Sequence, residues 1–527
     1  MKVTKGIAHI QPIWSRRLIS DFLNYWPILT LCSLAALVFL KGLGESSLVD
    51  WDEAIYAQIS KEIVQGGDWL TLHWQYKPYL RKPPILMWST AIFYQLFEIN
   101  EFWSRAASAF SGIGLIGITY LVGKFVYDRC VGFFAAVILL TSNFVSYARF
   151  GTTDIILTLF TYLAVYAYLR LEKGCQKWWY MIWISCALAF MTKSVAGLIA
   201  PVTITLSLLL NKKFVSTAQS RHFWQGLILA FVIVIPWHVL MYVQHGQAFI
   251  DQYIGHSIVE RSISVLEGNT GGPFYYVEQL QEDFSPWFFL LPFALALSVQ
   301  ENIDSKSRSR ILLLVFILVF GLYTIASTKL TWYIVPLYPA VAILIASMVT
   351  HAFKNYHSIA FSGLAVAITV VVLIAPLKIV VIFGCVGSLI IFLLLKIPKK
   401  LVYQLSVVVM CAFLVVVGTK MIEPLYSTRE APVAKLARLA GSKTPNDRES
   451  LIVFSGLYQP TPLFYSDRPV KEATTPQALA DFTKDHQTKR IILAAEDIKS
   501  LSIAYEIHVL AEAKPLVYAT IKVKTMQ

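Results

Sequence analysis

The sequence predicts a polytopic α-helical membrane protein that carries a small α/β domain at its carboxyl end. Apolar residues make up 56% of the 527 residues and charged residues only 15%, a composition too hydrophobic for a soluble globular protein. Apolar runs of roughly twenty residues, the length that crosses a bilayer as a helix, recur up to residue 422. After residue 422 the chain becomes more polar, with short strand-like runs.

About thirteen apolar runs are long enough to be spans. The first ends in Gly-Leu-Gly-Glu rather than in a small-residue cleavage signature, so we expect a retained span and not a signal peptide. The spans are expected at residues 26–43, 105–123, 131–148, 154–169, 178–192, 195–210, 224–243, 285–299, 311–327, 331–350, 358–377, 379–395 and 401–422.

Lysine and arginine residues cluster in the short loops between alternate runs. By the positive-inside rule, these loops and the basic amino terminus face the cytoplasm. This placement accounts for the net charge of +13, so the charge does not point to a nucleic-acid partner. The loops expected in the cytoplasm are residues 124–130, 170–177, 211–223, 300–310, 351–357 and 396–400.

Two long loops, residues 44–104 and 244–283, are then expected on the exterior side. The first should hold an amphipathic helix over Ala54–Gln65 that lies on the membrane surface, and a second helix from Pro83-Pro84 to about Leu96. The second contains the glycine-rich run Glu267–Pro273, which fits either a mobile flap over a site or an ordinary surface loop.

The tail, residues 423–527, follows an odd number of spans and is also expected outside. Its length is sufficient for an independent hydrophobic core, which predicts a small α/β domain. Strands are expected at Leu451–Ser455, Arg490–Ala494 and Tyr518–Val523, and helices near residues 429–440 and 475–486.

Isolated charged and polar residues gather at the exterior ends of the spans. A transporter would instead need ionisable groups near the bilayer midplane. The pattern therefore favours a pocket that opens to the exterior face. The residues concerned are Asp52, Glu53, Lys82, Arg149, Asp154, Lys193, Lys329 and Tyr333.

Asp52 and Lys82 each have a structural and a chemical interpretation. Asp52 precedes a helix, so it is either an N-cap or a carboxylate that orients or deprotonates an attacking hydroxyl, and Glu53 can take one of these tasks. Lys82 stands at the head of a helix, either as a lysine that reaches the membrane interface or as a ligand of a phosphate leaving group.

The other candidates also have two interpretations. Asp154 either pairs with Arg149 at a helix start or takes part in the site. Lys329 and Tyr333 fit a phosphate or sugar contact, or an ordinary aromatic belt. A lone histidine such as His256 is most often a surface or capping residue.

Six segments follow one another in order along the chain: Trp51–Glu62, Gly67–Trp69, Arg81–Pro84, Thr153-Asp154, Met191–Lys193 and Lys329–Tyr333. Together they resemble the aminoarabinose transferases that modify lipid A and, more distantly, the protein O-mannosyltransferases. The resemblance implies the GT-C fold and a sugar donor linked to a polyprenyl phosphate such as undecaprenyl phosphate. It also implies an exoplasmic active site and inversion at the sugar.

The resemblance further implies roles for Asp52, Lys82, Asp154 and Tyr333, and the other candidates are grouped with them. Asp52 is similar to the catalytic base of the family, and Asp154 to an aspartate that supports the site. The catalytic set is Asp52, Glu53 and Asp154; the donor phosphate set is Lys82, Lys329, Tyr333, Arg81 and Lys193; the flap or acceptor set is His256, Glu260 and Arg261.

Two departures from the aminoarabinose enzymes concern the metal and the sugar. Arg81 stands where those enzymes carry a glutamate that holds a metal together with a histidine, and His256 matches that histidine. No cofactor is therefore assigned, and a divalent cation at His256 is kept as an alternative. Ala54-Ile55 replaces an arginine of that family, which leaves the sugar and the acceptor open.

The sequence therefore predicts a glycosyltransferase of the bacterial plasma (inner) membrane. It would move a sugar from a polyprenyl-phosphate carrier to a lipid, glycan or protein acceptor on the exoplasmic face. Two alternatives remain: a flippase or transporter of a polyprenyl-linked substrate, and a scaffold whose exterior α/β domain binds a partner.

Overall fold

A computed structural model describes residues 13–355 and 430–524, apart from residues 267, 285–286, 305–307, 442–448 and 455–459. The spans expected at residues 358–377, 379–395 and 401–422 lie outside the described residues. Among the described residues, five helices are long and apolar enough to cross a membrane: Glu101–Val126, Thr153–Leu171, Trp178–Leu210, Arg221–His245 and Thr331–His351. The shorter apolar helices are Trp26–Leu40, Ile85–Leu96, Arg129–Leu140 and Arg310–Ile325.

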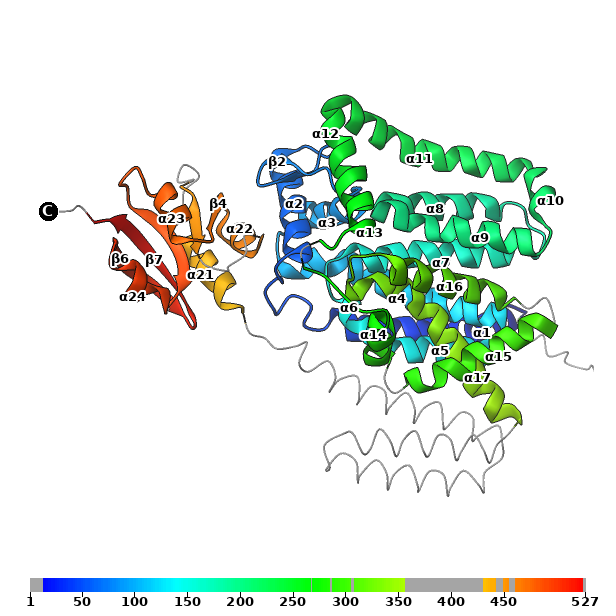
Figure 1. The fold of residues 1–527 in the computed structure, drawn as a ribbon. Coiled ribbons are helices and arrows are strands. Elements are labelled where there is room, and N and C mark those ends of the chain that lie inside the picture. The colour runs from blue at the N-terminus through cyan, green and yellow to red at the C-terminus, as the bar shows by residue number, and fades with distance from the viewer. Residues whose placement is uncertain are drawn as a thin grey trace, which may run out of the picture.

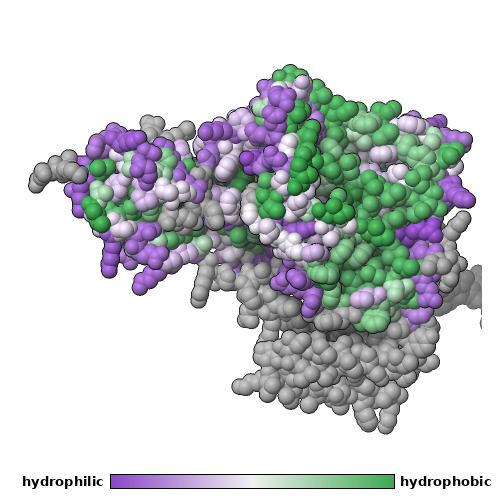
Figure 2. All heavy atoms as spheres, in the orientation of Figure 1, coloured by the Kyte–Doolittle hydropathy of each residue, from purple (hydrophilic) through white to green (hydrophobic). Residues whose placement is uncertain are grey.

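These helices form one bundle, with α4, α5, α7 and α17 around its core and α11 at its edge (Figure 1). On α11, Ile228, Val232 and Val239 are exposed, and Figure 2 shows an apolar surface there with hydrophilic residues towards both ends. Such a surface is suited to lipid. The bundle consists of α1 (Ile13–Leu40), α4 (Glu101–Val126), α5 (Arg129–Leu140), α7 (Thr153–Leu171), α8 (Trp178–Lys193), α9 (Ile199–Leu210), α11 (Arg221–His245), α15 (Leu291–Asp304), α16 (Arg310–Ile325) and α17 (Tyr338–Asn355).

The basic loops meet at one end of this bundle. Glu172 lies 3.5 Å from Lys213 and 4.0 Å from Arg308, measured between the charged atoms. Arg310 donates a hydrogen bond of 3.1 Å to the side chain of Asn211. The loops expected at residues 170–177, 211–223 and 300–310 therefore share one side, as the charge pattern predicted.

Helices α8 and α9 are two antiparallel passes, as predicted, although they are continuous in sequence. The chain reverses in the short helix η1 (Ser194–Leu198), since the loops before α8 and after α9 lie together at the basic end. At Gly197 a β-carbon would lie 2.4 Å from the backbone nitrogen of Phe190. Only glycine allows η1 to fold this closely against α8.

The single span expected at residues 131–148 is wrong, because the chain breaks after Leu140. It continues as the short helix α6 (Phe144–Ala148) after the polar turn Thr141-Ser142-Asn143. Asn143 accounts for the break: its side chain donates to Asp283 over 2.7 Å, and its backbone N–H donates to the Asp283 carbonyl over 2.8 Å. A long-range polar contact of this kind leaves no trace in local hydropathy.

The first exterior loop contains the two predicted helices, α2 (Asp52–Gly66) and α3 (Ile85–Leu96), and a small hairpin of β1 (His73–Trp74) and β2 (Lys77–Pro78). The expected position of α2 on the membrane surface is wrong, because the helix is buried within the protein from Glu53 to Ile63, apart from Ile55. Its polar side is covered: Glu62 accepts the backbone N–H groups of Gln75 and Tyr76 in the hairpin.

The second exterior loop is ordered against the segment that precedes η4 (Thr331–Leu337). Ser327 N–H donates to the Ser262 carbonyl over 3.0 Å, and Lys329 N–H to the Asn269 carbonyl over 3.1 Å. The loop contains α12 (Gln247–Ile250), the π-helix η2 (Asp251–Glu260), α13 (Arg261–Ile263) and α14 (Tyr275–Phe284).

The carboxyl-terminal segment contains a five-stranded sheet in the order β4-β3-β5-β7-β6. β3 is parallel to β4 and β5, and β7 is antiparallel to β5 and β6. Alternate residues of β3 face two cores, Ile452 on one side and Val453 on the other. The three strands named from the sequence are present, whereas β4 and β6 were missed. The elements are α21 (Pro432–Ala440), β3 (Leu451–Phe454), α22 (Pro460–Ser466), β4 (Val470–Ala473), α23 (Pro476–Phe482), β5 (Lys489–Ala494), α24 (Asp497–Leu501), β6 (Tyr505–Ala513) and β7 (Leu516–Val523).

Candidate active site

Four of the predicted site residues lie together at the end of the bundle opposite the basic loops. Asp154 is in the first turn of α7, and Lys193 ends α8, so both stand away from the loop that joins these helices. The Lys193 ammonium lies 2.5 Å from the Asp154 carboxylate. Lys82 interacts electrostatically with both of these residues and with Asp52. Residues from the first loop, α7 and α8 therefore converge as the sequence predicted.

The surroundings of the Lys82 amine favour the binding of an anion. Its pKa is lowered from the ordinary 10.5 to about 8, chiefly by burial and then by the neighbouring charge of Lys193, while Asp52 opposes the shift. A phosphate placed beside this amine would favour its charged form and relieve the repulsion between the two lysines.

Arg261 and Tyr333 complete the cationic side of the site. Arg261 donates a hydrogen bond of 3.1 Å to the Tyr333 hydroxyl, and its charge reaches Lys82. The Lys193 ammonium lies 4.7 Å from the centre of the Tyr333 ring, within the range of a cation–π interaction. The second exterior loop thus contributes Arg261 directly beside the lysines.

Tyr56 belongs to the same site and was missed. Its side chain is buried, and its hydroxyl has no hydrogen-bond partner among the described residues. Burial and the nearby Asp52 carboxylate raise the pKa of this hydroxyl, which keeps it a neutral donor. In the sequence, Tyr56 is one of several aromatic residues of an amphipathic helix. Its position one turn after Asp52 is the one signal that places it in the site.

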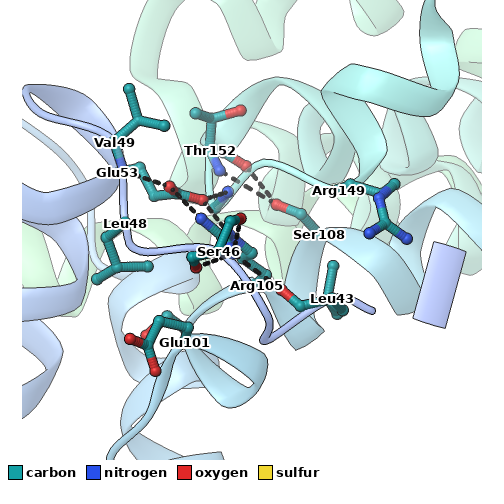
Figure 3. A network of polar contacts seen from close by, with 12 residues as sticks. Leu43, Ser46, Leu48, Val49, Glu53, Glu101, Arg105, Ser108, Arg149 and Thr152 are labelled. Carbon is teal, nitrogen blue, oxygen red and sulfur yellow. Dashed lines mark hydrogen bonds and ion pairs between the residues drawn. The ribbon is translucent and has the colours of Figure 1, made fainter. Parts of the chain in front are cut away.

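The contacts of Glu53 favour a structural role over the predicted catalytic one, which stays a prediction. One carboxylate oxygen accepts the Arg105 Nε–H over 2.8 Å and the Gly151 N–H over 3.0 Å. The other accepts the Arg105 Nη2–H over 3.0 Å and the Val49 N–H over 2.8 Å (Figure 3). Because both oxygens are occupied and the residue is only 1% exposed, its geometry favours holding α2 to α4 and to the turn before Asp154.

The structure also decides the two alternatives for Asp52 and Asp154. The residue that precedes α2 is Trp51, and no side chain caps that helix end, so the N-cap interpretation of Asp52 is not supported. Arg149 does not pair with Asp154: it donates to the backbone carbonyls of Phe39, Lys41 and Gly42 at the end of α1, and Lys193 is the partner of Asp154.

The Lys329 side chain caps the C-terminus of α16 and does not contact the cluster around Lys82. Its ammonium donates to the carbonyls of Tyr323 and Thr324 over 2.9 and 2.6 Å, in the last turn of α16. This contact satisfies carbonyls that a helix end leaves free, which gives Lys329 a capping role in place of the predicted phosphate contact. Arg81 is exposed, and its place in the donor phosphate set remains a prediction.

His256 and Glu260 pair with each other on η2, with 2.7 Å between Nδ1 and the carboxylate. Over the part of the chain that the structure describes, no group of three or more His, Cys, Asp or Glu residues is arranged to hold a metal ion. The geometry therefore offers no ligand set for the cation considered at His256, and the acceptor role of this pair remains a prediction.

Comparison with known proteins identifies the fold. Residues 81–240 match the family described as dolichyl-phosphate-mannose-protein mannosyltransferase. ArnT from Cupriavidus metallidurans, solved with undecaprenyl phosphate, superposes with a TM-score of 0.75 at 21% identity, over 94% of this chain and 98% of that chain. The chain has the GT-C fold. A second solved structure, the oligosaccharyltransferase AglB from Archaeoglobus fulgidus, gives a TM-score of 0.54 at 14% identity, over 94% and 74% of the two chains.

Curated relatives extend the likeness to sequence. Undecaprenyl phosphate-alpha-4-amino-4-deoxy-L-arabinose arabinosyl transferase of Pseudomonas savastanoi is 27% identical over 322 residues, 60% of this chain and 60% of its own length. The enzyme of the same name from Shewanella sediminis is 27% identical over 344 residues, 60% and 59% of the two. The chain thus spans about three fifths of the length of these relatives. It has the GT-C fold, and its sequence is similar to the aminoarabinose transferases and, over residues 81–240, to the mannosyltransferase family model.

Proposed function

We propose that this GT-C protein is an integral-membrane glycosyltransferase that moves a sugar from a polyprenyl-phosphate carrier to an acceptor on the exoplasmic face of a bacterial plasma membrane. The observation that supports it most directly is the cluster of Lys82, Lys193 and Arg261 beside Asp52 and Asp154. Three cations against two carboxylates leave one positive charge, which matches a single phosphodiester.

In this proposal the cationic side receives the lipid phosphate. As the bond between the sugar C1 and the phosphate oxygen breaks, negative charge grows on the phosphate. The Lys82 and Lys193 ammonium groups and the Arg261 guanidinium stabilise that charge. Asp154 acts through Lys193, since it fixes the position of that ammonium.

Asp52 acts on the acceptor. Its carboxylate orients the attacking hydroxyl or amine and accepts its proton while the new bond to C1 forms on the face opposite the leaving phosphate. The outcome is inversion. Transfer is favoured over translocation, because these charges gather at one end of the described helices rather than along a path through them. The acceptor is a lipid, a glycan or a protein.

Replacement of Asp52 tests the proposal. Asp52→Asn keeps the size of the side chain and removes the base, so we expect transfer to fall by at least ~100-fold, while the protein still inserts in the membrane. Transfer is measured by mass spectrometry of glycolipids and glycoproteins. The cells compared carry the wild type, the variant or no protein.

Asp68→Asn is the matched control, because Asp68 is an exposed acid of the same loop. It should leave the product unchanged. A wild-type level of product with Asp52→Asn would contradict the role given to Asp52, and identical profiles with and without the protein would contradict the transferase itself.

A further inference from the structure

The backbone just before Asp52 is held by a part of the chain that lies 384 to 417 residues away in sequence. Thr461 N–H donates to the Asp50 carboxylate over 2.9 Å, across a separation of 411 residues. Leu48 N–H donates to the Tyr465 hydroxyl over 2.8 Å, and Ala431 N–H donates to the Ser47 hydroxyl over 3.0 Å. Helix α22 and the start of α21 thus bind the segment that leads into α2.

This segment contains a strained residue next to the proposed base. Trp51 has φ 69° and ψ −130°, a backbone conformation that residues other than glycine rarely adopt. Such a residue persists only when its surroundings fix it from both sides. On the α2 side, Glu53 accepts the Val49 N–H and binds Arg105. On the other side the fixed point is Asp50, held by Thr461.

Helix α22 is itself firmly docked on the first loop. The Lys61 ammonium, on α2, donates to the Phe464 carbonyl over 3.0 Å and lies 3.1 Å from the Asp467 carboxylate. Phe464 packs with Leu48, Ala54 and Ala57 in one apolar cluster. The Tyr465 hydroxyl donates to Glu101 over 2.9 Å, at the start of α4. Contacts to α2 and α4 make α22 a rigid support.

We propose that α22 is a positioning element for the active site, in which the Asp50–Thr461 hydrogen bond keeps the strained Trp51 peptide in place and so aims Asp52 at the acceptor. This inference rests on the proposed function, since it assigns Asp50 to the support of the same site. Asp50 is a positioning residue whose carboxylate serves as a hydrogen-bond acceptor rather than as a charge.

Two substitutions of Asp50 separate these roles. Asp50→Ala removes the acceptor, whereas Asp50→Asn removes the charge but keeps an oxygen for the Thr461 N–H. The matched control is Asp467→Asn, which weakens the Lys61 contact of the same interface and leaves Asp50 untouched. The full-length protein in detergent is used for all three variants.

Three readouts are compared with those of the wild type: hydrogen–deuterium exchange of the backbone at residues 48–57, affinity for undecaprenyl phosphate, and the glycoconjugate product in cells. With Asp50→Ala we expect faster exchange at residues 48–57 and an affinity for undecaprenyl phosphate within about twofold of the wild type. Transfer should fall by at least ~10-fold, since a small misplacement of a catalytic group lowers the reaction rate. Asp50→Asn should restore both exchange and transfer, and Asp467→Asn should change neither.

Three results would overturn the inference: unchanged exchange with Asp50→Ala, faster exchange together with normal transfer, or an equal loss of transfer with Asp50→Asn. The last would show that the charge of Asp50 is what matters. If the wild type produces no glycoconjugate while exchange still rises with Asp50→Ala, the support of residues 48–57 stands and the proposed function falls.

Discussion

Lys82 shows how the environment of one residue creates its chemistry. A lysine beside two prolines at the head of a helix is ordinarily a solvated cation, and nothing in the local sequence shifts its pKa. Burial and the approach of Lys193, which ends a different helix, lower the pKa of Lys82 to about 8. Near pH 8 the Lys82 amine is therefore only partly protonated when the site is empty. A bound phosphate would favour its charged form.

The pH dependence of donor capture follows from this pKa. Lys82 is charged below about pH 8 in the empty site and loses its charge as the pH rises through that value. We expect kcat/KM for the lipid donor to fall about tenfold between pH 7 and pH 9, because a neutral amine does not attract phosphate. Steady-state kinetics against pH measure the effect.

Lys82→Arg is the control, since arginine stays charged over this range. Its profile should be flat between pH 7 and pH 9, at whatever absolute rate the longer side chain allows. A wild-type profile without this fall, or the same fall with Lys82→Arg, would contradict the assignment.

At the scale of elements, one buried ion pair sets the relative positions of several segments. Glu53 lies in the first turn of α2, Arg105 lies in α4, and Gly151 precedes α7, so their contacts fix the segments that carry Asp52 and Asp154 (Figure 3). Arg105 also donates to the carbonyls of Leu43 and Ser46 after α1. The pair thus connects α2, α4 and the segments that precede α2 and α7.

Breaking this ion pair should cost stability. Glu53→Gln leaves a buried guanidinium without its counter-charge, so we expect the unfolding free energy to fall by roughly 3 kcal/mol. The double variant Glu53→Gln with Arg105→Gln should lose less than the sum of the two single variants, because it contains no uncompensated charge. Thermal unfolding in detergent, followed by size-exclusion chromatography, compares the four proteins. Strictly additive losses would show that the two residues act independently.

At the scale of the whole molecule, the positions of the basic loops and of the site predict how the chain is oriented in the membrane. The basic loops share one end of the bundle, and the cluster around Lys82 lies at the other. Under the positive-inside rule, we therefore expect the site and the carboxyl-terminal sheet to face the exoplasm.

Cysteine labelling tests this orientation. We expect a cysteine at Lys471, an exposed position of β4, to react with a membrane-impermeant maleimide in intact spheroplasts. A cysteine at Lys212, in a basic loop, should react only after the membrane is opened. The background is a variant in which the native cysteines are replaced. The reverse pattern would place the site in the cytoplasm.

The sequence alone determined the membrane fold, the shared side of the basic loops and the group of Asp52, Lys82, Asp154 and Lys193, because hydropathy, charge bias and motif order are local properties of the chain. Tertiary structure decided what each residue contacts. It gave Glu53 and Lys329 contacts that favour structural roles, and it placed Arg261, predicted for the flap or acceptor set, on the cationic side near Lys82. It also added Tyr56 to the site and covered α2 with α22. Those outcomes depend on which distant groups the fold places next to each carboxylate or ammonium. Hydrogen bonds between segments up to 417 residues apart produce no periodicity in the sequence.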